Sequence, residues 1–297
     1  LPSLALPVPT GFLIGKPVQA HLDRGERGVI KGFTKHLSGS GFLIPGTDRR
    51  FTAERLCTEA FRLIARGARI QVGSLERAVI AAPSGFTSAQ LRGIKQAARR
   101  AGLCSAEIIP AAIAACLAYA EEQAPPSKPF DARYVRGVYS RKRVLVVDLD
   151  EYSFEAALVQ LSKAGEFDVL ASAVDDRFGG EEWEAIFLEM ILKGFEKDTG
   201  KDPKSSSKRM RELRRKSAAA FKDLNFESTA SVEFIHAYEE YELTITRRRF
   251  ADAAGVLLDT LTRKLKRMLR SADFGWENVA MVLLVGPYAQ MPMVRDR

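Results

Sequence analysis

Short apolar runs alternate with helix-spaced apolar positions along most of the chain, which predicts a mixed α/β protein. The runs rich in β-branched residues predict strands, because glycine, proline or polar residues bound each of them. The predicted strands are 76–82, 107–109, 143–148, 154–161, 167–173, 231–235, 241–245 and 278–285. The predicted helices are 87–101, 110–123, 181–197, 208–224 and 247–270. The sequence therefore combines hairpins with strand–helix–strand units.

Local signals fix several of these boundaries. Thr87 and Thr246 stand where a helix N-cap is expected, and Gly102 follows the end of the first long helix. Residues 124–142 are rich in proline and basic side chains, which predicts a loop or a small insertion. Residues 1–14 are apolar but contain three prolines and no basic start, so we do not interpret them as a signal peptide.

Length and composition describe a globular protein rather than a disordered one. The chain has 297 residues and is 46% hydrophobic, enough for one two-lobed domain or two ordinary domains. No apolar run approaches the roughly 20 residues that a membrane-spanning helix needs, so no transmembrane segment is expected. The chain begins with Leu rather than Met, which suggests a fragment or a processed end.

Cysteine and histidine give no sign of a metal centre. Cys57, Cys104 and Cys116 lack metal-site spacing, and their odd number argues against a disulfide framework. We interpret them as buried, reduced thiols, which favours a reducing compartment and a cytoplasmic location. The three histidines are far apart and have no ligand partner at suitable spacing.

The formal net charge is +8, and the excess lies mainly in residues 204–222, 247–249 and 263–270. A basic surface can bind nucleic acid or an acidic membrane. Solvated faces of amphipathic helices explain the same pattern, because the basic residues interleave with helix-spaced Leu and Met and lack aromatic stacking partners. Nucleic acid is therefore the less favoured partner.

Four segments together carry a family resemblance. Residues 78–103 (AVIAAPSGFTSAQLRGIKQAARRAGL) closely resemble the strand–turn–helix of the heat-shock 70 kDa (DnaK-type) chaperone family. The segments 177–182 (RFGGEE), 241–250 (YELTITRRRF) and 283–294 (LLVGPYAQMPMV) are similar to that family's later motifs, in the same order. Residues 1–75 match much more loosely.

The resemblance implies an α/β, actin-like ATPase (RNase-H-like) fold, with two lobes around a nucleotide cleft. Two glycine-rich turns hold the phosphates in that fold. By this comparison residues 1–142 are a remnant of lobe I without the first phosphate turn. Residues 143–297 carry the second phosphate hairpin and lobe II, and end just after the adenosine turn. The fold is thus expected to be incomplete at both ends.

The second phosphate turn of the family reads DLGGGTFD, and the matching residues 148–155 read DLDEYSFE. Asp148 matches the carboxylate that holds the metal and its water, and Ser153 replaces the hydroxyl. Asp150, Glu151 and Tyr152 replace three glycines whose bare backbone lets N–H groups approach phosphate oxygens. Each new carboxylate about 4 Å from a phosphate would cost roughly 4 kcal/mol at an effective dielectric constant near 20. A bound divalent ion would relieve part of this repulsion.

The other nucleotide contacts of the family are altered as well. Ala111 stands where the resemblance places a catalytic glutamate. In the adenosine turn Gly286 is kept, but Pro287 removes an N–H group and Tyr288 adds bulk near the base. The family's Glu, Lys, Arg and Ser of the adenine-binding helix align with Ala218, Phe221, Lys222 and Asn225. Lys35, in the stretch GFTKHL, is a candidate for the family's catalytic lysine.

The remnants of a nucleotide site would be Asp148, Ser153, Gly179, Gly180, Lys222, Asn225 and Gly286, with Asp148 as the metal ligand. Turn geometry alone also explains the glycines, and a solvated strand end also explains Asp148. Because the core strands stay well patterned while several contacts change together, we predict a pseudo-ATPase interaction module with protein partners or co-chaperones. No cofactor is then expected.

Two alternatives stay open. One is a divergent but working domain that binds and hydrolyses ATP with Mg²⁺. The other is a basic module that binds nucleic acid or a membrane surface.

Overall fold

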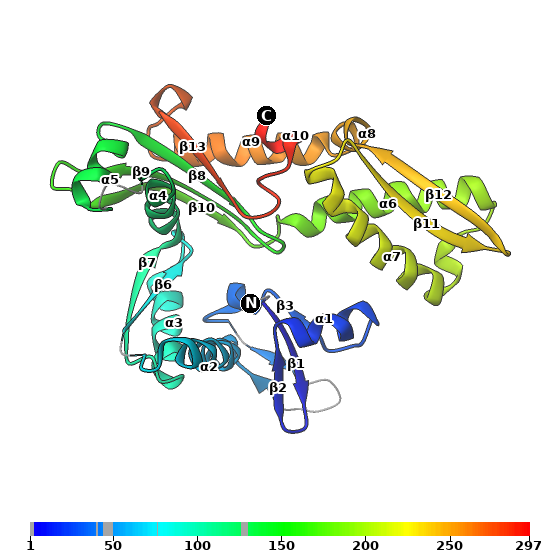
Figure 1. Cartoon of the computed structure of the whole chain (residues 1–297), viewed down its shortest axis with the longest axis horizontal. Helices are drawn as coiled ribbons and strands as arrows, with labels where there is room; N and C mark the ends of the chain where they lie inside the picture. Colours follow the sequence, from blue (N-terminus) through cyan, green and yellow to red (C-terminus); the bar gives the residue numbers. More distant parts are fainter. Residues whose placement is uncertain (1–2, 40, 44–49, 76, 126–129) are drawn as a thin grey trace. The chain divides into compact units, whose positions relative to one another are not determined.

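The computed structural model describes residues 3–39, 41–43, 50–75, 77–125 and 130–297 (Figure 1). The chain divides into two compact units, each described here by itself. The first unit comprises Leu1–Arg141 and Val159–Val174, and the second comprises Lys142–Leu158 and Asp175–Arg297. The assignment of residues 1–142 and 143–297 to two lobes stays a prediction.

The first unit begins with a small antiparallel sheet. Strands β1 (Leu4–Val8) and β2 (Gly11–Ile14) form a hairpin, and β3 (Ile30–Lys31) pairs with the other edge of β1. Between β2 and β3 lies helix α1 (Lys16–Asp23), and the short 3-10 helix η1 (Phe33–His36) follows β3. Strands β4 (Phe42–Leu43) and β5 (Arg50–Phe51) form a second antiparallel pair. The apolar residues near the N-terminus are thus strand residues.

Two helices and a parallel strand pair follow in the same unit. Helix α2 (Ala53–Val72) packs against α3 (Ser88–Arg100), as Figure 1 shows. Strands β6 (Arg77–Ala82) and β7 (Ser105–Pro110) are parallel, as expected for strands joined through a helix. Helices α4 (Ala111–Glu122) and α5 (Ala132–Tyr139) come next. The buried apolar faces of α2 and α3 form the core here.

A four-stranded sheet has the order β10-β9-β8-β13. Its strands are β8 (Arg143–Leu149), β9 (Phe154–Leu161), β10 (Phe167–Asp175) and β13 (Met281–Val285). Strands β8 and β13 are parallel, with Asp148 opposite Val285. Both strands end at the same edge, so this register brings the predicted phosphate turn and the predicted adenosine turn together.

Apart from β8, β13 and the start of β9, the second unit consists mainly of helices and one hairpin. Helices α6 (Gly180–Thr199) and α7 (Ser207–Phe221) lie along the hairpin of β11 (Thr229–His236) and β12 (Glu239–Thr246) in Figure 1. The 3-10 helices η2 (Pro203–Ser205), η3 (Lys222–Asn225) and η4 (Trp276–Asn278) form connections. Helices α8 (Arg247–Ala253), α9 (Gly255–Arg270) and α10 (Pro292–Arg295) complete the unit. Fully buried aromatic rings form its core, among them Trp183, Phe187, Phe195, Phe234 and Phe250.

The structure corrects three predicted elements. The predicted loop 124–142 contains α5, where Asp131 acts as N-cap and accepts hydrogen bonds from the amides of Arg133 and Tyr134. The predicted helix 247–270 is two helices, because Ala254 interrupts it. The predicted strand 278–285 is shorter, since η4 occupies its start. Residue 76 of one predicted strand, and residues 126–129 of the predicted loop, lie outside the described residues.

The capping predictions are confirmed, and the prediction for the cysteines is confirmed in part. Thr87 caps α3 in a capping box with Gln90, and Thr246 caps α8. All three cysteines are free, but only Cys57 and Cys116 are buried, whereas Cys104 is exposed. Burial raises the pKa of each buried thiol to about 12, so both thiols are protonated and unreactive at neutral pH. Among the described helices none is long and apolar enough to cross a membrane.

Candidate functional site

The turn of residues 150–153 connects β8 to β9 and is held by backbone hydrogen bonds. The amide of Asp150 donates to the carbonyl oxygen of Ser153 at 3.0 Å. The carbonyl oxygens of Asp150 and Glu151 accept hydrogen bonds from the first amides of α6, those of Gly180 at 2.8 Å and Glu181 at 3.0 Å. Free amides at a helix N-terminus attract anions. These two amides of α6 already have partners in the turn.

Gly179 permits this close approach of the turn to α6. A Cβ atom added there would lie 2.6 Å from the amide nitrogen of Ser153 and 2.8 Å from the carbonyl oxygen of Glu151. The amide of Gly179 donates to the carboxylate of Glu182 at 2.8 Å, which satisfies a further donor at the start of the helix. The glycine is required for packing between two protein segments.

Tyr152 is buried where the family has a glycine. Its hydroxyl donates to the carboxylate of Glu151 at 2.7 Å. Burial, and then this hydrogen bond, raise the pKa of Tyr152 above its ordinary value, so the hydroxyl stays protonated and remains a donor. The side chains of Tyr152 and Glu151 are thus partners for one another.

Tyr288 occupies the space beside Gly180. A Cβ atom on Gly180 would lie 2.2 Å from a carbon of the tyrosine ring, so only glycine leaves room for this ring. The ring stacks on Phe221 with 6.2 Å between centroids and 25° between planes. The Tyr288 hydroxyl donates to the carboxylate of Glu184 at 2.5 Å. Helix α6, the end of α7 and the loop after β13 therefore converge on one aromatic side chain.

Glu184 and Tyr288 form a polar pair within this packing. Burial raises the pKa of Glu184, while the hydrogen bond from Tyr288 opposes that rise. Burial also raises the pKa of Tyr288, and the nearby Glu184 carboxylate adds to the effect. The pair is stabilised by its own hydrogen bond, which leaves neither group without a partner.

Asp148 and Gly286 meet at the ends of the parallel strands β8 and β13. Gly286 has a φ of 82°, and a Cβ atom there would lie 2.6 Å from Oδ1 of Asp148 and from the carbonyl oxygen of Leu149. Burial, followed by the negative charges of Asp150 and Glu155, raises the pKa of Asp148 to about 6. The carboxylate thus lies close to two other acids.

The adenine-binding helix of the resemblance corresponds to the end of α7 and to η3. Phe221 is buried among the rings of Phe187, Phe250 and Tyr288. Lys222 is exposed. Asn225 has a buried Oδ1 atom with no hydrogen-bond partner among the described residues. An apolar contact therefore replaces one polar position, and another retains an unsatisfied acceptor.

The structure brings most, but not all, of the predicted site residues together. Asp148, Ser153, Gly179, Gly180 and Gly286 lie around the turn and its contacts with α6 and the loop after β13. Lys35 is on η1 and Ala111 is the first residue of α4, both in the first unit. Sequence reasoning missed Glu184. A tyrosine hydroxyl that is partly buried usually has a hydrogen-bond partner, and this requirement was the available signal.

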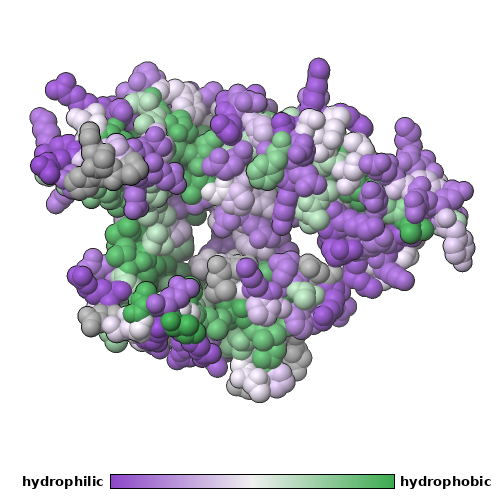
Figure 2. Space-filling model, viewed as in Figure 1, coloured by the Kyte–Doolittle hydropathy of each residue, from purple (hydrophilic) through white to green (hydrophobic). Residues whose placement is uncertain are grey.

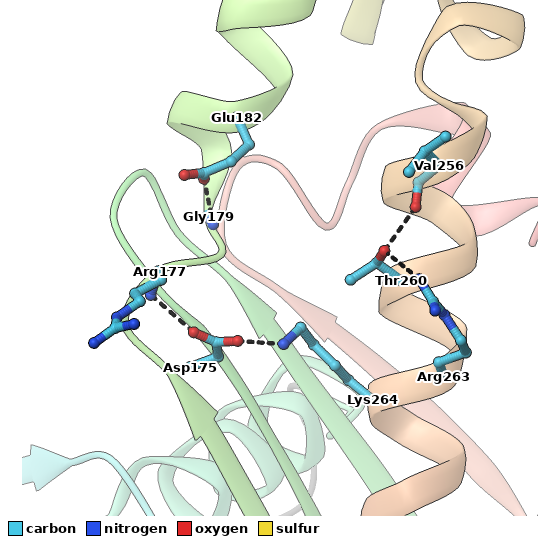
Figure 3. A network of polar contacts seen from close by, with 8 residues as sticks. All are labelled: Asp175, Arg177, Gly179, Glu182, Val256, Thr260, Arg263 and Lys264. Carbon is cyan, nitrogen blue, oxygen red and sulfur yellow. Dashed lines mark hydrogen bonds and ion pairs between the residues drawn. The ribbon is translucent and has the colours of Figure 1, made fainter.

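A polar network holds the segment that leads into α6, as Figure 3 shows. The carboxylate of Asp175, the last residue of β10, accepts hydrogen bonds from the amide of Arg177 at 2.8 Å and from the ammonium group of Lys264 on α9. Burial acts to raise the pKa of Asp175, but these hydrogen bonds outweigh it and the net pKa is lowered. The ion pair therefore anchors the start of the Gly179–Gly180 segment to α9.

The described part of the chain contains no group of three or more His, Cys, Asp or Glu side chains arranged to hold a metal ion. Asp148 is the one predicted metal ligand, and its neighbours Asp150 and Glu155 are the acids that raise its pKa.

The comparison with known families agrees with the motifs and with the strand register. The family model described as Hsp70 protein matches residues 38–297, so the match begins well before the segments that carried the resemblance and excludes Lys35. Members of this family have an actin-like, chaperone-type ATPase domain, typically bind ATP or ADP with Mg²⁺, and work with co-chaperones and substrate proteins. The mixed α/β elements described above confirm the predicted fold class. The chain belongs to the Hsp70 protein family.

Proposed function

We propose that this Hsp70-type domain is a pseudo-ATPase, an interaction module whose nucleotide site is filled by its own residues. We call the region of residues 148–153, 179–184, Phe221 and Tyr288 the filled site. The observation that carries the proposal is the position of Tyr288, which packs on Gly180 and Phe221 and bonds to Glu184. An adenosine group bound at the turn after β13 would compete with this ring for the same space.

The phosphate turn supports the proposal independently. A triphosphate needs N–H donors and positive charge close to its oxygens. The turn presents carboxylates at Asp150 and Glu151, and its backbone carbonyls already accept the two amides of α6. The residues of this turn do not fit a nucleoside triphosphate, so we assign them no step of ATP hydrolysis.

Calorimetry on the 297-residue chain tests the proposal. We expect no saturable heat when MgATP or MgADP is added up to about 1 mM. Binding at micromolar concentration would contradict the proposal.

A second titration uses adenosine, which carries no phosphate. It therefore measures the effect of the Tyr288 ring on binding without the repulsion from the acidic turn. We expect Tyr288→Ser to bind adenosine at least fivefold more tightly than the unaltered chain. Tyr238→Ser is the matched control, because Tyr238 is fully exposed at the tip of the β11–β12 hairpin. Equal responses of the two variants would show that Tyr288 does not block the base.

A divergent but working ATP-binding domain is the second candidate, because two features of a nucleotide site survive. Gly286 has a left-handed backbone beside Asp148, and the buried Oδ1 of Asn225 has no hydrogen-bond partner in the part of the chain that the structure describes. Micromolar binding of MgATP by the unaltered chain, lost in Asn225→Leu but not in Tyr238→Ser, would favour this candidate.

A further inference from the structure

Helix α2 carries four arginines on one exposed face. Arg55, Arg62, Arg66 and Arg69 are separated by seven, four and three residues, which places them in one stripe of an α-helix. Arg50 of β5 and Arg100 at the end of α3 border the same stripe. We call these six residues the arginine face. It lies wholly in the first unit, and no predicted nucleotide contact belongs to it.

The arginine face is hollowed rather than flat. One hollow of ≈ 450 Å³ is lined by Arg50, Arg55, Arg62 and Arg100 among others. A second, of ≈ 370 Å³, is lined by Arg62, Arg66 and Arg69 together with Ile70 and Ala101. Arg62 lines both, so the two hollows adjoin along the helix. The stripe from Arg55 to Arg69 is about 21 Å long at 1.5 Å per residue.

The positive charge of this face is only partly compensated, and Glu54 of the same helix lies near enough to Arg100 to interact with its charge. Glu59 is the one acidic residue among the lining residues, and it bonds Arg62 at 2.7 Å. Arg62 also donates to the carbonyl oxygen of Arg100 at 3.4 Å, and Arg69 donates to that of Gly102 at 3.3 Å. Arg55 lies over the ring of Phe12. Carbonyl and ring contacts orient guanidinium groups without neutralising them, which leaves them ready for carboxylates.

An aliphatic stripe lies beside the arginines. Leu63 and Ile70 are seven residues apart on α2, and 41% and 82% of their surfaces are exposed. Ile70 also lines the second hollow. Figure 2 shows hydrophilic and hydrophobic surface next to each other over the region of α2 and α3. A partner that covers this region must therefore offer both acidic and aliphatic side chains.

The chemistry of the face selects among polyanions. Single-stranded nucleic acid binds on exposed aromatic rings as well as on cations. The one aromatic residue that lines the hollows is Phe51, which is only 4% exposed. Exposed aliphatic groups instead match the apolar stripe of an amphipathic helix. We propose that the arginine face docks an acidic amphipathic helix of a partner protein, about four turns long, with its carboxylates on the arginines and its aliphatic stripe on Leu63 and Ile70.

Fluorescence anisotropy with a synthetic helix tests the proposal on the 297-residue chain. The probe is a labelled 16-residue peptide with a glutamate stripe beside a leucine stripe, and a scrambled peptide of equal composition is its reference. We expect the ordered peptide to bind at least fivefold more tightly than the scrambled one at about 150 mM salt. Equal binding would overturn the proposal, because net charge alone would then explain the attraction.

Charge reversal on two helices distinguishes this face from general basicity. Arg62→Glu/Arg66→Glu/Arg69→Glu on α2 should weaken binding at least tenfold. Arg263→Glu/Lys266→Glu/Arg267→Glu on α9 makes the same change of charge at exposed positions and should weaken it less than threefold. Equal losses would contradict the proposal, and circular dichroism melts confirm that both variants fold.

A third variant tests the aliphatic stripe without altering charge. Leu63→Ser/Ile70→Ser should lower the affinity for the ordered peptide about fivefold and leave the affinity for poly-glutamate unchanged. Binding of a labelled dT20 oligonucleotide and of vesicles rich in anionic lipid tests nucleic acid and membrane as alternative occupants of the arginine face. Either of them binding more tightly than the peptide, with loss in the α2 charge-reversal variant, would replace the acidic helix as the occupant.

Discussion

The filled site and the arginine face differ in how their polar groups are satisfied. In the filled site, most polar groups pair with one another: Tyr288 with Glu184, Tyr152 with Glu151, and the amides of α6 with the turn. Two groups differ, since Asp148 faces other acids and the buried Nε1 of Trp183 has no hydrogen-bond partner among the described residues. On the arginine face, the lining residues supply six cations and one acid. Buried polar groups need hydrogen-bond partners inside the protein, whereas exposed charges are solvated and can bind groups of another molecule.

This difference bears on which of the two regions is the better candidate for binding a partner. A polar group that already has a partner inside the protein gains little from a ligand, since the contact with the ligand would replace one that is already present. A face with oriented but unneutralised guanidinium groups gains new charge-assisted contacts when an anion binds. Under the proposed function, the helix surface is therefore the better candidate for recognition than the filled site.

The largest expected effect is that of a single methyl group in the filled site. In Gly179→Ala the new Cβ meets backbone atoms of residues 151–153, which cannot rotate away as a side chain can. We expect the free energy of unfolding to fall by about 3 kcal/mol, at the upper end for overpacking. Urea denaturation monitored by circular dichroism measures it.

Gly67→Ala on α2 is the matched control for that experiment. A Cβ atom on Gly67 has nothing within 4 Å, and alanine is about 0.8 kcal/mol more favourable than glycine in a helix interior. We therefore expect Gly67→Ala to stabilise the chain slightly. A Gly179→Ala variant as stable as Gly67→Ala would mean that the turn does not pack closely on α6.

The next effect is the loss of a hydrogen bond to a partly buried carboxyl group. Tyr288→Phe keeps the ring on Gly180 and Phe221 but removes the donor to Glu184, which should cost about 2 kcal/mol at pH 7. Tyr241→Phe removes an exposed hydroxyl bonded to Glu239 and should cost less than about 0.5 kcal/mol. Thermal and urea denaturation compare the two. Similar small losses of stability in the two variants would show that the hydrogen bond between Tyr288 and Glu184 does not stabilise the filled site.

Asp148 provides a test in which a substitution is expected to raise the stability of the chain. Its pKa is raised to about 6, so the folded chain binds the proton more tightly than the unfolded chain does. The carboxylate therefore lowers stability as the pH rises from about 4 to 6, and the loss is constant above that range. The full shift corresponds to about 3 kcal/mol, which partial exposure reduces to about 1–2 kcal/mol.

Asp148→Asn should accordingly stabilise the chain by about 1–2 kcal/mol at pH 7 and leave it nearly unchanged at pH 4. Urea denaturation at several pH values between 4 and 7 measures this difference. Asp150→Asn, which removes one of the neighbouring charges, should show the same trend with smaller amplitude. A difference between Asp148→Asn and the unaltered chain that is independent of pH would exclude this explanation.

Much of the fold could be predicted from the sequence because its strands are apolar, short and clearly bounded. Strand β9 was predicted with its observed ends, and the Thr87 cap fixed the start of α3. Helix α5 could not be recognised, since its eight residues follow a proline-rich stretch and its signal is one capping aspartate, Asp131. The interruption at Ala254 is marked in the sequence by Gly255 alone, and a single glycine within a helical pattern does not by itself predict a break.

The candidate site was predictable residue by residue but not as a packed unit. The altered turn and the bulk of Tyr288 were visible in the sequence. Their partners were not, because Glu184 is 104 positions away from Tyr288 and lies on another helix. The arginine stripe was overlooked in favour of denser basic runs, since a spacing of seven, four and three residues forms a cluster only after the helix has formed.

The smallest effect is expected at the ion pair that leads into the filled site. Asp175 and Lys264 are each about one-quarter exposed, so solvent screens their attraction. The net pKa of Asp175 is lowered, so its stabilising contribution is present above its ordinary value near 4 and is lost as the pH falls through the lowered pKa. A double-mutant cycle with Asp175→Asn and Lys264→Met at pH 7 should give a coupling energy of about 0.5–1 kcal/mol.

The same cycle on the exposed pair of Glu189 and Lys193 should give a smaller coupling energy, because that pair is more solvated. A coupling energy near zero at Asp175 would show that the hydrogen bond from the Arg177 amide, rather than the ion pair, holds the segment before α6.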